Sequence, residues 1–211
     1  MNKIIVTAVF SLFPLVAWAQ PKGYTSVKNT TTFETELSNA NAGIRTINSD
    51  FSQTKNMALL AEKVKSKGKF YFMKEDKIRI EYTQPFSYIL VMNKGQVLVK
   101  DEQKTSKVNT KNSKALQSVN RIMIDCMRGT ILSNPDFKAS VFESGNSYLI
   151  ALIPSQAAMK NMFSGIDIYL TKKQFDVTRL VMKENGGDLT DMNFSNAQHN
   201  QPLNETLFKV K

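Results

Sequence analysis

The residues best suited to nucleophilic chemistry are few in this sequence. Cys126 is the only cysteine and His199 the only histidine among 211 residues. Paired, they would make the one candidate for a thiol-protease dyad, in which a histidine activates a thiolate. Cys126 lies on the apolar stripe of a predicted helix, where an inert buried thiol is typical. His199 lies in the polar stretch SNAQHNQPLN, where a solvated side chain is typical. The pattern therefore weighs against a dyad.

The acidic residues form no recognisable catalytic or metal-binding motif. Glu75–Asp76 and the pair Asp188 and Asp191 lie at predicted turns, where carboxylates are usually solvated. The sequence has no GxSxG, HExxH or CxxC pattern and no Gly-rich phosphate loop. Nor does it cluster histidine, cysteine and carboxylates at the spacing of metal ligands. We therefore predict a protein that is not an enzyme, without catalytic residues, a metal site or a cofactor.

The formal net charge of +10 comes mainly from lysines, many of them at strand spacing. This spacing predicts a solvated face, and the charge also suits acidic lipid headgroups or an acidic protein partner. There is no Arg-rich run and no Gly-aromatic RNA-binding motif, so we expect no nucleic-acid partner. A single cysteine excludes an internal disulfide, so the fold must depend on its apolar core.

The first 19 residues have the pattern of a secretory signal peptide. Lys3 precedes an apolar run, Ile4 to Val16, and the stretch AWA that ends at Ala19 has the small-x-small form of a cleavage site. The run is short for a membrane anchor, and no basic stop follows it. We predict cleavage after Ala19, which leaves residues 20–211 as one exported domain. No cysteine at the junction would carry a lipid.

Two segments have the apolar spacing of amphipathic helices. The first begins near Thr31 or Thr32, either of which can cap it, and its apolar positions are Phe33, Leu37, Ala40, Ile44 and Ile47. The second runs between Ser113 and Leu132 and is interrupted near Gly129. Its apolar stripe is Leu116, Val119, Met123 and Met127, flanked by Ile122 and Cys126.

The rest of the chain alternates as antiparallel strands do. Residues 60–72 place lysines at odd positions and mostly apolar or small residues at even ones, and Gly68 predicts a bulge or bend. Asn93–Gly95 and Glu184–Gly187 are hairpin signals. The final LFKV is predicted as a last strand. Successive hairpins predict one antiparallel sheet, curved around the helices to bury its inner face.

The stretch KIRIEYTQPFSYILV, residues 77–91, changes character at Pro85. Before it, apolar residues alternate with charged ones; after it, both sides are apolar, Ile89 included. The candidate inward set is Phe51, Phe70, Phe72, Ile78, Ile80, Tyr82 and Phe86. Periodicity alone leaves two interpretations open: an ordinary core, or a cavity wall covered by a soft, Met-containing lid.

Several stretches together resemble the periplasmic carriers of outer-membrane lipoproteins, the LolA-type family. INSDFSQ (47–53) resembles the family's entry into its first long strand, and GKFYF (68–72) with DKIRIEYTQP (76–85) resembles the next strand pair. Asn93–Gln96 stands at the position of a family turn. GGDLT (186–190), followed by Phe194 and Asn200, resembles the closing motif. The order and spacing of these stretches carry the resemblance over nearly the whole mature chain.

The resemblance implies a mainly β fold with helices: a single antiparallel, strongly curved, unclosed β-barrel whose helical lid encloses an apolar cavity. It implies a periplasmic, monomeric chaperone that binds acylated lipoproteins. It would receive them from an inner-membrane lipoprotein-releasing transporter and deliver them to an outer-membrane acceptor. The expected lipid-binding residues are Phe51, Phe70, Phe72, Ile78, Ile80, Tyr82, Phe86, Ile89, Leu116, Val119, Met123 and Met127.

This sequence departs from the family pattern at two places. Lys74–Glu75 stands where the family often has Arg-Pro, and the family arginine holds the lid shut, so Lys74 is the expected lid latch. A lysine is a point donor without a planar fork, which predicts a different latch. Val97–Val99 replaces a usual aromatic. Two rivals remain: a protein of the same fold that binds another amphiphile or a partner, and an exported hydrolase.

Overall fold

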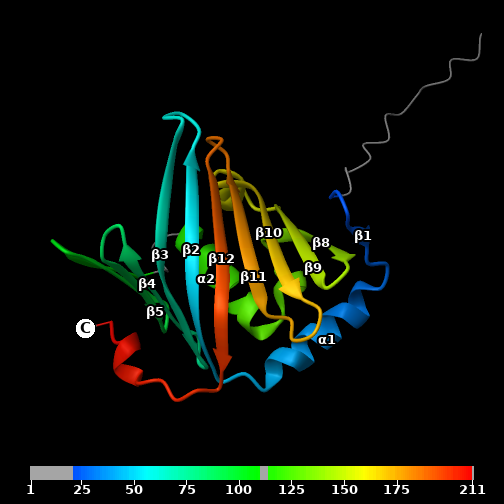
Figure 1. The fold of residues 1–211 in the computed structure, drawn as a ribbon, viewed down its shortest axis with the longest axis horizontal. Helices are drawn as coiled ribbons and strands as arrows, with labels where there is room; N and C mark the ends of the chain where they lie inside the picture. The colour runs from blue at the N-terminus through cyan, green and yellow to red at the C-terminus, as the bar shows by residue number, and fades with distance from the viewer. Residues whose placement is uncertain (1–20, 110–113, 211) are drawn as a thin grey trace, which may run out of the picture.

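One antiparallel sheet of twelve strands dominates this computed structural model, which describes residues 21–109 and 114–210 apart from the side chains of residues 114–116 and 119 (Figure 1). The strands are β1 (Thr25–Ser26), β2 (Thr46–Met57), β3 (Glu62–Met73), β4 (Lys77–Gln84), β5 (Tyr88–Asn93), β6 (Gln96–Asp101), β7 (Thr105–Asn109), β8 (Phe137–Ser144), β9 (Ser147–Pro154), β10 (Phe163–Thr171), β11 (Val177–Glu184) and β12 (Leu189–His199). Their order in the sheet is β1-β8-β9-β10-β11-β12-β2-β3-β4-β5-β6-β7. Because β1 and β7 are two separate edges, the sheet is not closed, and the predicted open antiparallel fold is confirmed.

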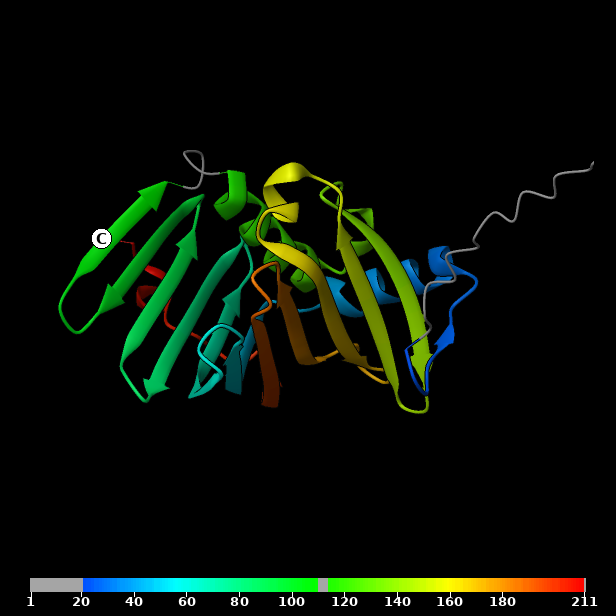
Figure 2. The ribbon, with the colours of Figure 1, turned by 90° about the horizontal axis from the view of Figure 1, so that it is seen from above.

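Helices cover the inner side of this sheet. They are α1 (Thr30–Ala42), α2 (Lys114–Arg128) and the short α3 (Ala157–Lys160), with 3₁₀ turns η2 (Ile131–Ser133) and η3 (Glu205–Phe208). Viewed from above, the sheet curves around α2 (Figure 2). Apolar residues of α2 pack against both the β8–β10 side and the β2–β6 side of the sheet. α2 is therefore the element that spans the concave face.

The predicted irregularity at Gly68 is confirmed. The register between β3 and β4 shifts between Lys67 and Gly68. A Cβ atom at Gly68 would lie 2.0 Å from the Glu81 carbonyl oxygen and 2.8 Å from the Phe51 ring. Only glycine allows this close approach, which bends the strand pair and contributes to the curvature of the sheet.

The ends of the two long helices differ in how well they were predicted. α1 is capped by Asn29, whose side chain accepts a hydrogen bond from Thr32 N at 3.0 Å, so the prediction of a threonine cap is wrong. α1 ends at Ala42, and Ile47 belongs to β2. α2 ends at Arg128, as predicted. Gly129 follows with φ +74° and lies against the Leu37 carbonyl of α1, a place that a side chain would fill.

The buried apolar residues form three clusters. We call the first the packed half; it joins β8–β10 to α1 and α3, and includes Phe33, Leu37, Ile150, Leu152, Met159 and Ile166. We call the second the inner wall; it lies on the concave side of β2–β6 and includes Ile44, Phe51, Phe70, Phe72, Ile78, Ile80, Met92 and Val97. The third is the outer cluster of Val91, Leu98 and Phe208.

The C-terminal segment forms the 3₁₀ turn η3, so the predicted last strand at LFKV is wrong. Asn204 caps this turn by accepting a hydrogen bond from Thr206 N at 2.9 Å. Phe208 is buried against the convex side of β5 and β6, and its carbonyl accepts a hydrogen bond from the Asn93 side chain at 2.9 Å. A cap residue and one deep anchor favour a turn over strand pairing here.

This outer cluster explains why the segment after Pro85 has apolar residues on both faces of the strand. Leu90 and Met92 face the inner wall, while Ile89 and Val91 pack against Phe208 and its neighbours. The prediction that Ile89 lines the inside is therefore wrong. The alternation of side chains along β5 places Ile89 on the convex face, under η3.

Residues 1–20 lie outside the described part of the chain, so the signal peptide remains a prediction. The described residues include no helix with the length and apolar character needed to cross a membrane.

Candidate functional site

A cavity of about 90 Å³ lies between α2 and the sheet. Its walls are mostly apolar side chains from the ends of β2, β3, β10, β11 and β12 and from the C-terminal half of α2. Residues that line it include Ile44, Ile47, Phe70, Met123, Met127, Leu180 and Phe194. The concave face is thus nearly filled with protein side chains, with a small remaining space under α2.

The predicted lining residues fall into groups. Phe70, Met123 and Met127 line the cavity. Phe51, Phe72, Ile78, Ile80 and Tyr82 belong to the inner wall around it, and all but Tyr82 are buried. Leu116 and Val119 lie in α2, but their side chains are outside the described part.

Phe86 does not face inward, and its prediction is wrong. It lies in the β4–β5 turn after β4 ends at Gln84, and the residue is 73% exposed. The period of two that places Ile78, Ile80 and Tyr82 inside holds only within the strand. It cannot be extended through the turn to Phe86.

Several lining residues were missed by sequence reasoning. Ile47 and Phe194 lie in the stretches that carried the family resemblance, so this signal was available. Ile44 was assigned to the helix, yet it follows α1 and closes the base of the cavity. Phe175 and Leu180 come from the β10–β11 hairpin, where a strand pattern alone does not tell which residues meet α2.

His199 lines the cavity, which sequence reasoning did not predict. It is the last residue of β12, and its Nε2 lies 2.8 Å from Asp176 Oδ1, with only 26% and 20% of the two side chains exposed. Cys126 lines the same cavity. Burial raises the pKa of the Cys126 thiol to about 12, so it stays protonated at neutral pH. A thiol of this kind lacks the activation that a nucleophile needs. Across the described ranges, no group of three or more His, Cys, Asp or Glu residues could hold a metal ion.

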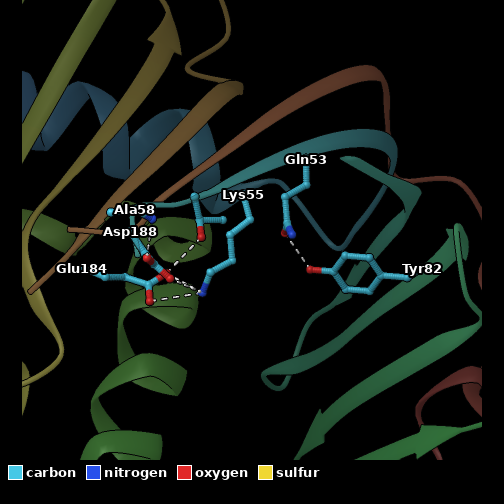
Figure 3. Close-up of polar contacts among 7 residues, drawn as sticks. Gln53, Lys55, Ala58, Tyr82, Glu184 and Asp188 are labelled. Carbon is cyan, nitrogen blue, oxygen red and sulfur yellow. Dashed lines mark hydrogen bonds and ion pairs between the residues drawn. The ribbon is translucent and has the colours of Figure 1, made fainter. Parts of the chain in front are cut away.

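The open end of the concave face is polar, in contrast to the cavity. Lys55 Nζ lies 3.1 Å from Glu184 and 3.5 Å from Asp188 (Figure 3). The hydrogen bond with Glu184 is the largest of the contacts that raise the pKa of Lys55. Thr190 Oγ1 donates to Glu184 at 3.0 Å. This end, which we call the mouth, is therefore charged and tightly paired.

Tyr82 links the mouth to the inner wall. Its hydroxyl donates to Gln53 Oε1 at 2.8 Å, as Figure 3 shows, while its ring packs edge-on against Phe51 and Tyr88. Burial raises the pKa of Tyr82 to about 12, so the hydroxyl remains a donor at neutral pH. The concave face thus changes from apolar at its base to polar at its mouth, as an amphiphile would require.

α2 is fastened at both ends by polar contacts. At its C-terminal end Arg128 Nη2 donates to both carboxylate oxygens of Asp76, each at 2.8 Å. Towards its N-terminal end Ser118 Oγ donates to Asp136 at 2.7 Å. Lys74, the expected latch, donates instead to the Ala42 carbonyl of α1 at 3.0 Å. The guanidinium that holds α2 therefore lies on the helix, and its acidic partner in the β3–β4 turn.

A family model described as "Outer membrane lipoprotein carrier protein LolA" matches residues 42–211. The chain belongs to this family. The match spans the sheet from just before β2 to the C-terminus, and with it both walls of the cavity and α2. The resemblance seen in the sequence is thereby confirmed for the LolA family. A comparison with curated proteins finds no match.

Solved structures that are similar to this chain have low sequence identity with it. A conserved protein from Thermus thermophilus has 10% identity and a TM-score of 0.53, covering 86% of this chain and 94% of its own. The MucA/MucB complex of Pseudomonas aeruginosa gives 10% identity and a TM-score of 0.50, over 86% of this chain and 60% of that one. A LolA superfamily protein from Nitrosomonas europaea has 11% identity and a TM-score of 0.45, covering 83% of this chain and 97% of its own. At this identity the similarity concerns the fold alone.

Proposed function

We propose that this protein is a non-enzymatic periplasmic carrier that binds the acyl chains of lipoproteins between α2 and the inner wall. The observation that carries the proposal is the apolar cavity under α2, in a chain that belongs to the LolA family. The predicted signal peptide would export residues 20–211 as one domain, acting as a monomer. An inner-membrane lipoprotein-releasing transporter would supply the client, and an outer-membrane acceptor would take it.

The size of the cavity implies that α2 must move for a client to bind. Ligand pockets typically enclose roughly 300–1,000 Å³, whereas this cavity measures about 90 Å³. Met123, Ile124 and Met127 occupy the space that an acyl chain would take. Moving α2 outward would free this space, and flexible methionines would then cover chains of different shape.

The same exchange explains how a client could leave. Each methylene transferred from water to an apolar site contributes about 0.8 kcal/mol, so an acyl chain alone would bind strongly. When α2 returns, its own apolar side chains bury the inner wall again. The net affinity is set by the free energy of burying the acyl chain minus the free energy of burying the inner wall under α2. It is therefore smaller than the total contribution of the methylenes of the chain. The polar mouth would contact the peptide part of the client.

A cavity-filling variant tests the proposal. Ser49 is buried and lines the cavity, whereas Ser52 lies on the same strand and is exposed. Ser49→Leu should block acyl-chain binding, and Ser52→Leu should leave it unchanged. Exported protein is analysed by native mass spectrometry for bound lipoprotein, and by fluorescence of an apolar dye. If both variants bind as the wild type does, or the wild type binds neither lipoprotein nor dye, the proposal is wrong.

A second candidate is a protein-binding role in the same fold. The MucA/MucB complex, whose fold is similar, was solved with two different proteins together. Under this alternative the partner would bind without an acyl group. Capture of the same protein with and without its lipid modification distinguishes the two: an acyl-chain carrier should retain only the modified form.

A further inference from the structure

The turn between β2 and β3 is built from residues that turns rarely use. Its sequence is Ala58-Leu59-Leu60-Ala61, with no Gly, Pro, Asn or Asp to favour the bend. Ala61 has a φ of +52°, a left-handed conformation that costs energy for a residue with a Cβ. Leu59 and Leu60 are 94% and 61% exposed. Two leucines thus extend into solvent from a strained turn.

This tip is held in place by the polar contacts of the mouth. Ala58 N donates to Asp188 Oδ1 at 3.0 Å, and Lys55 bridges Glu184 and Asp188 (Figure 3). The turn is thereby tied to the β11–β12 turn beside it. Because the tip is already ordered, binding through the leucines would cost little additional conformational entropy.

More exposed apolar residues lie at the same end of the sheet. β2–β3 and β4–β5 are both turns at this end, because successive antiparallel strands reverse direction. Val64 is 38% exposed near the tip and Phe86 73% exposed in the β4–β5 turn. The β2–β3 hairpin projects beyond its neighbours in Figure 1, so its leucines form the most prominent point of this apolar end.

Lysines flank the tip on β3. Lys63, Lys65 and Lys67 are all exposed, and among the described residues none of their ammonium groups is within ion-pair distance of a carboxylate. With Glu62 as the one acid in residues 58–67, this segment carries a net charge of +2. The leucines lie at the tip of the turn, and the lysines lie further along β3. This order matches an anionic lipid surface, where the phosphate layer lies outside the hydrocarbon layer.

We propose that the β2–β3 tip is a membrane-docking site that inserts Leu59 and Leu60 into an anionic phospholipid surface. Lys63, Lys65 and Lys67 then contact the headgroups. Docking at this tip would place the mouth beside the membrane. The inference goes beyond the proposed function, because the tip would bind lipid vesicles whether or not the cavity holds an acyl chain.

Vesicle flotation of the exported protein tests this inference. Vesicles of phosphatidylethanolamine and phosphatidylglycerol are compared with vesicles of phosphatidylcholine alone, with no lipoprotein present. Wild type should float with the anionic vesicles. Leu59→Ser with Leu60→Ser should lower the partition coefficient about tenfold or more. Lys63→Gln with Lys65→Gln should lower it by up to about 25-fold, since each of the two lysines near an anionic surface raises binding about fivefold.

Matched controls use exposed residues away from the tip. Val108→Ser replaces another apolar residue of 38% exposure on the edge strand β7. Lys94→Gln with Lys209→Gln removes two exposed lysines at the opposite end of the sheet. Both should float as the wild type does. All variants share one N-terminus, so any contribution from it cancels.

A second measurement reports insertion itself. Leu59→Cys in a Cys126→Ser background is labelled with an environment-sensitive dye. Its emission should shift to the blue on anionic vesicles. The proposal is overturned by a wild type that fails to float at low salt, by leucine variants that float normally, or by an unshifted dye. Flotation lost equally in the control variants would also contradict it, whereas dye binding to the cavity would still test the carrier function separately.

Discussion

The packed half and the inner wall bury their apolar residues against different kinds of partner. In the packed half, α1 and α3 cover β8–β10, and Leu152 and Met159 have no exposed surface. The inner wall is covered by α2 through Met123, Ile124 and Met127, each only partly buried, with a cavity beside them. The packed half thus has residues that are buried completely, away from the cavity, whereas the inner wall is closed by flexible side chains on a single helix.

This difference suggests a division of roles between the two halves. A close-packed cluster strongly resists changes in volume, so the packed half should maintain the fold. The inner wall consists of paired strands, but it is covered by one helix, α2, which contacts both the inner wall and the packed half. Moving α2 away would leave α1 in place on the packed half. The comparison therefore predicts that stability and ligand binding respond to different residues.

The largest expected change in the free energy of unfolding distinguishes the packed half from the cover of the inner wall. Leu152→Ala should lower the free energy of unfolding by about 3–5 kcal/mol, because it leaves a cavity in a filled cluster. Met123→Ala should cost roughly 1 kcal/mol, since the side chain is partly exposed and adjoins an existing cavity. Urea denaturation followed by circular dichroism measures both.

Apolar-dye binding completes this test. Met123→Ala enlarges the cavity and should strengthen dye binding, whereas Leu152→Ala should not change it while the protein stays folded. Equal losses of stability in the two variants would show that α2 belongs to the fixed core, and the division of roles would then be wrong.

The second prediction concerns the rigid part of the inner wall. Gly68→Ala should lower the free energy of unfolding by about 3 kcal/mol, because its Cβ would lie 2.0 Å from the Glu81 carbonyl oxygen. This oxygen belongs to the backbone of β4, so it cannot move away without disturbing the β3–β4 pairing. Gly165→Ala is the control, since its Cβ would meet its nearest neighbour at 3.6 Å. Thermal unfolding of both variants gives the comparison, and equal melting temperatures would contradict it.

The sequence predicted the wall better than its cover. Alternation along β3 and β4 identified Phe70, Phe72, Ile78 and Ile80, and Gly68 indicated its bulge, because strand geometry is local and has a fixed period. Two residues were placed wrongly. Phe86 lies in a turn, where the alternation of a strand no longer applies, and Ile89 lies on the convex face, which η3 covers. No local signal shows that a C-terminal segment returns to cover β5.

The contacts that fasten α2 were not predictable from spacing. Asp76 and Arg128 are far apart in sequence. An aspartate is common in turns and an arginine is common at helix C-termini, so neither residue stands out in the sequence. Lys74 was chosen by resemblance and bonds to α1 instead. His199 was expected in a solvated loop, yet a strand extended to that residue places it on the cavity. Such contacts depend on how distant elements meet, which periodicity does not encode.

The third prediction uses Cys126, which lies on α2 between the two halves. Burial raises the pKa of its thiol to about 12, above about 8.5 for a free thiol. The unfolded chain therefore loses this proton first, and stability should fall as pH rises from about 8.5 towards 12. At pH 9.5 the loss should be about 1 kcal/mol relative to pH 7.

Cys126→Ala isolates this contribution. Because the variant lacks the titrating group, the stability of wild type relative to the variant, measured by urea denaturation, should be constant below about pH 8 and fall above it. The thiol of wild type should also react with a disulfide reagent at pH 8 far more slowly than a free thiol, and faster when α2 opens for a client. Rapid labelling of the empty protein would mean that α2 does not cover the cavity in solution.

The smallest expected effect on stability tests the fastening of α2. Asp76→Asn removes the ion pair with Arg128, and asparagine tolerates the left-handed backbone at this position, where φ is +61°. Both side chains are partly exposed, so the free energy of unfolding should fall by less than about 1 kcal/mol. Labelling of Cys126 and dye binding should nevertheless rise several-fold, because the C-terminal end of α2 is released.

Asp50→Asn is the matched control for this release. It removes an ion pair of the same length, 2.8 Å, and similar exposure, but this pair joins β2 to β3 and does not contact α2. Asp50→Asn should lower the free energy of unfolding by a similar amount to Asp76→Asn, but it should not change the rate of Cys126 labelling. If the two variants label alike, Arg128 and Asp76 form only a surface ion pair. If Asp76→Asn alone labels faster, a contact of small energy controls access to the inner wall, because it acts on the one helix that covers it.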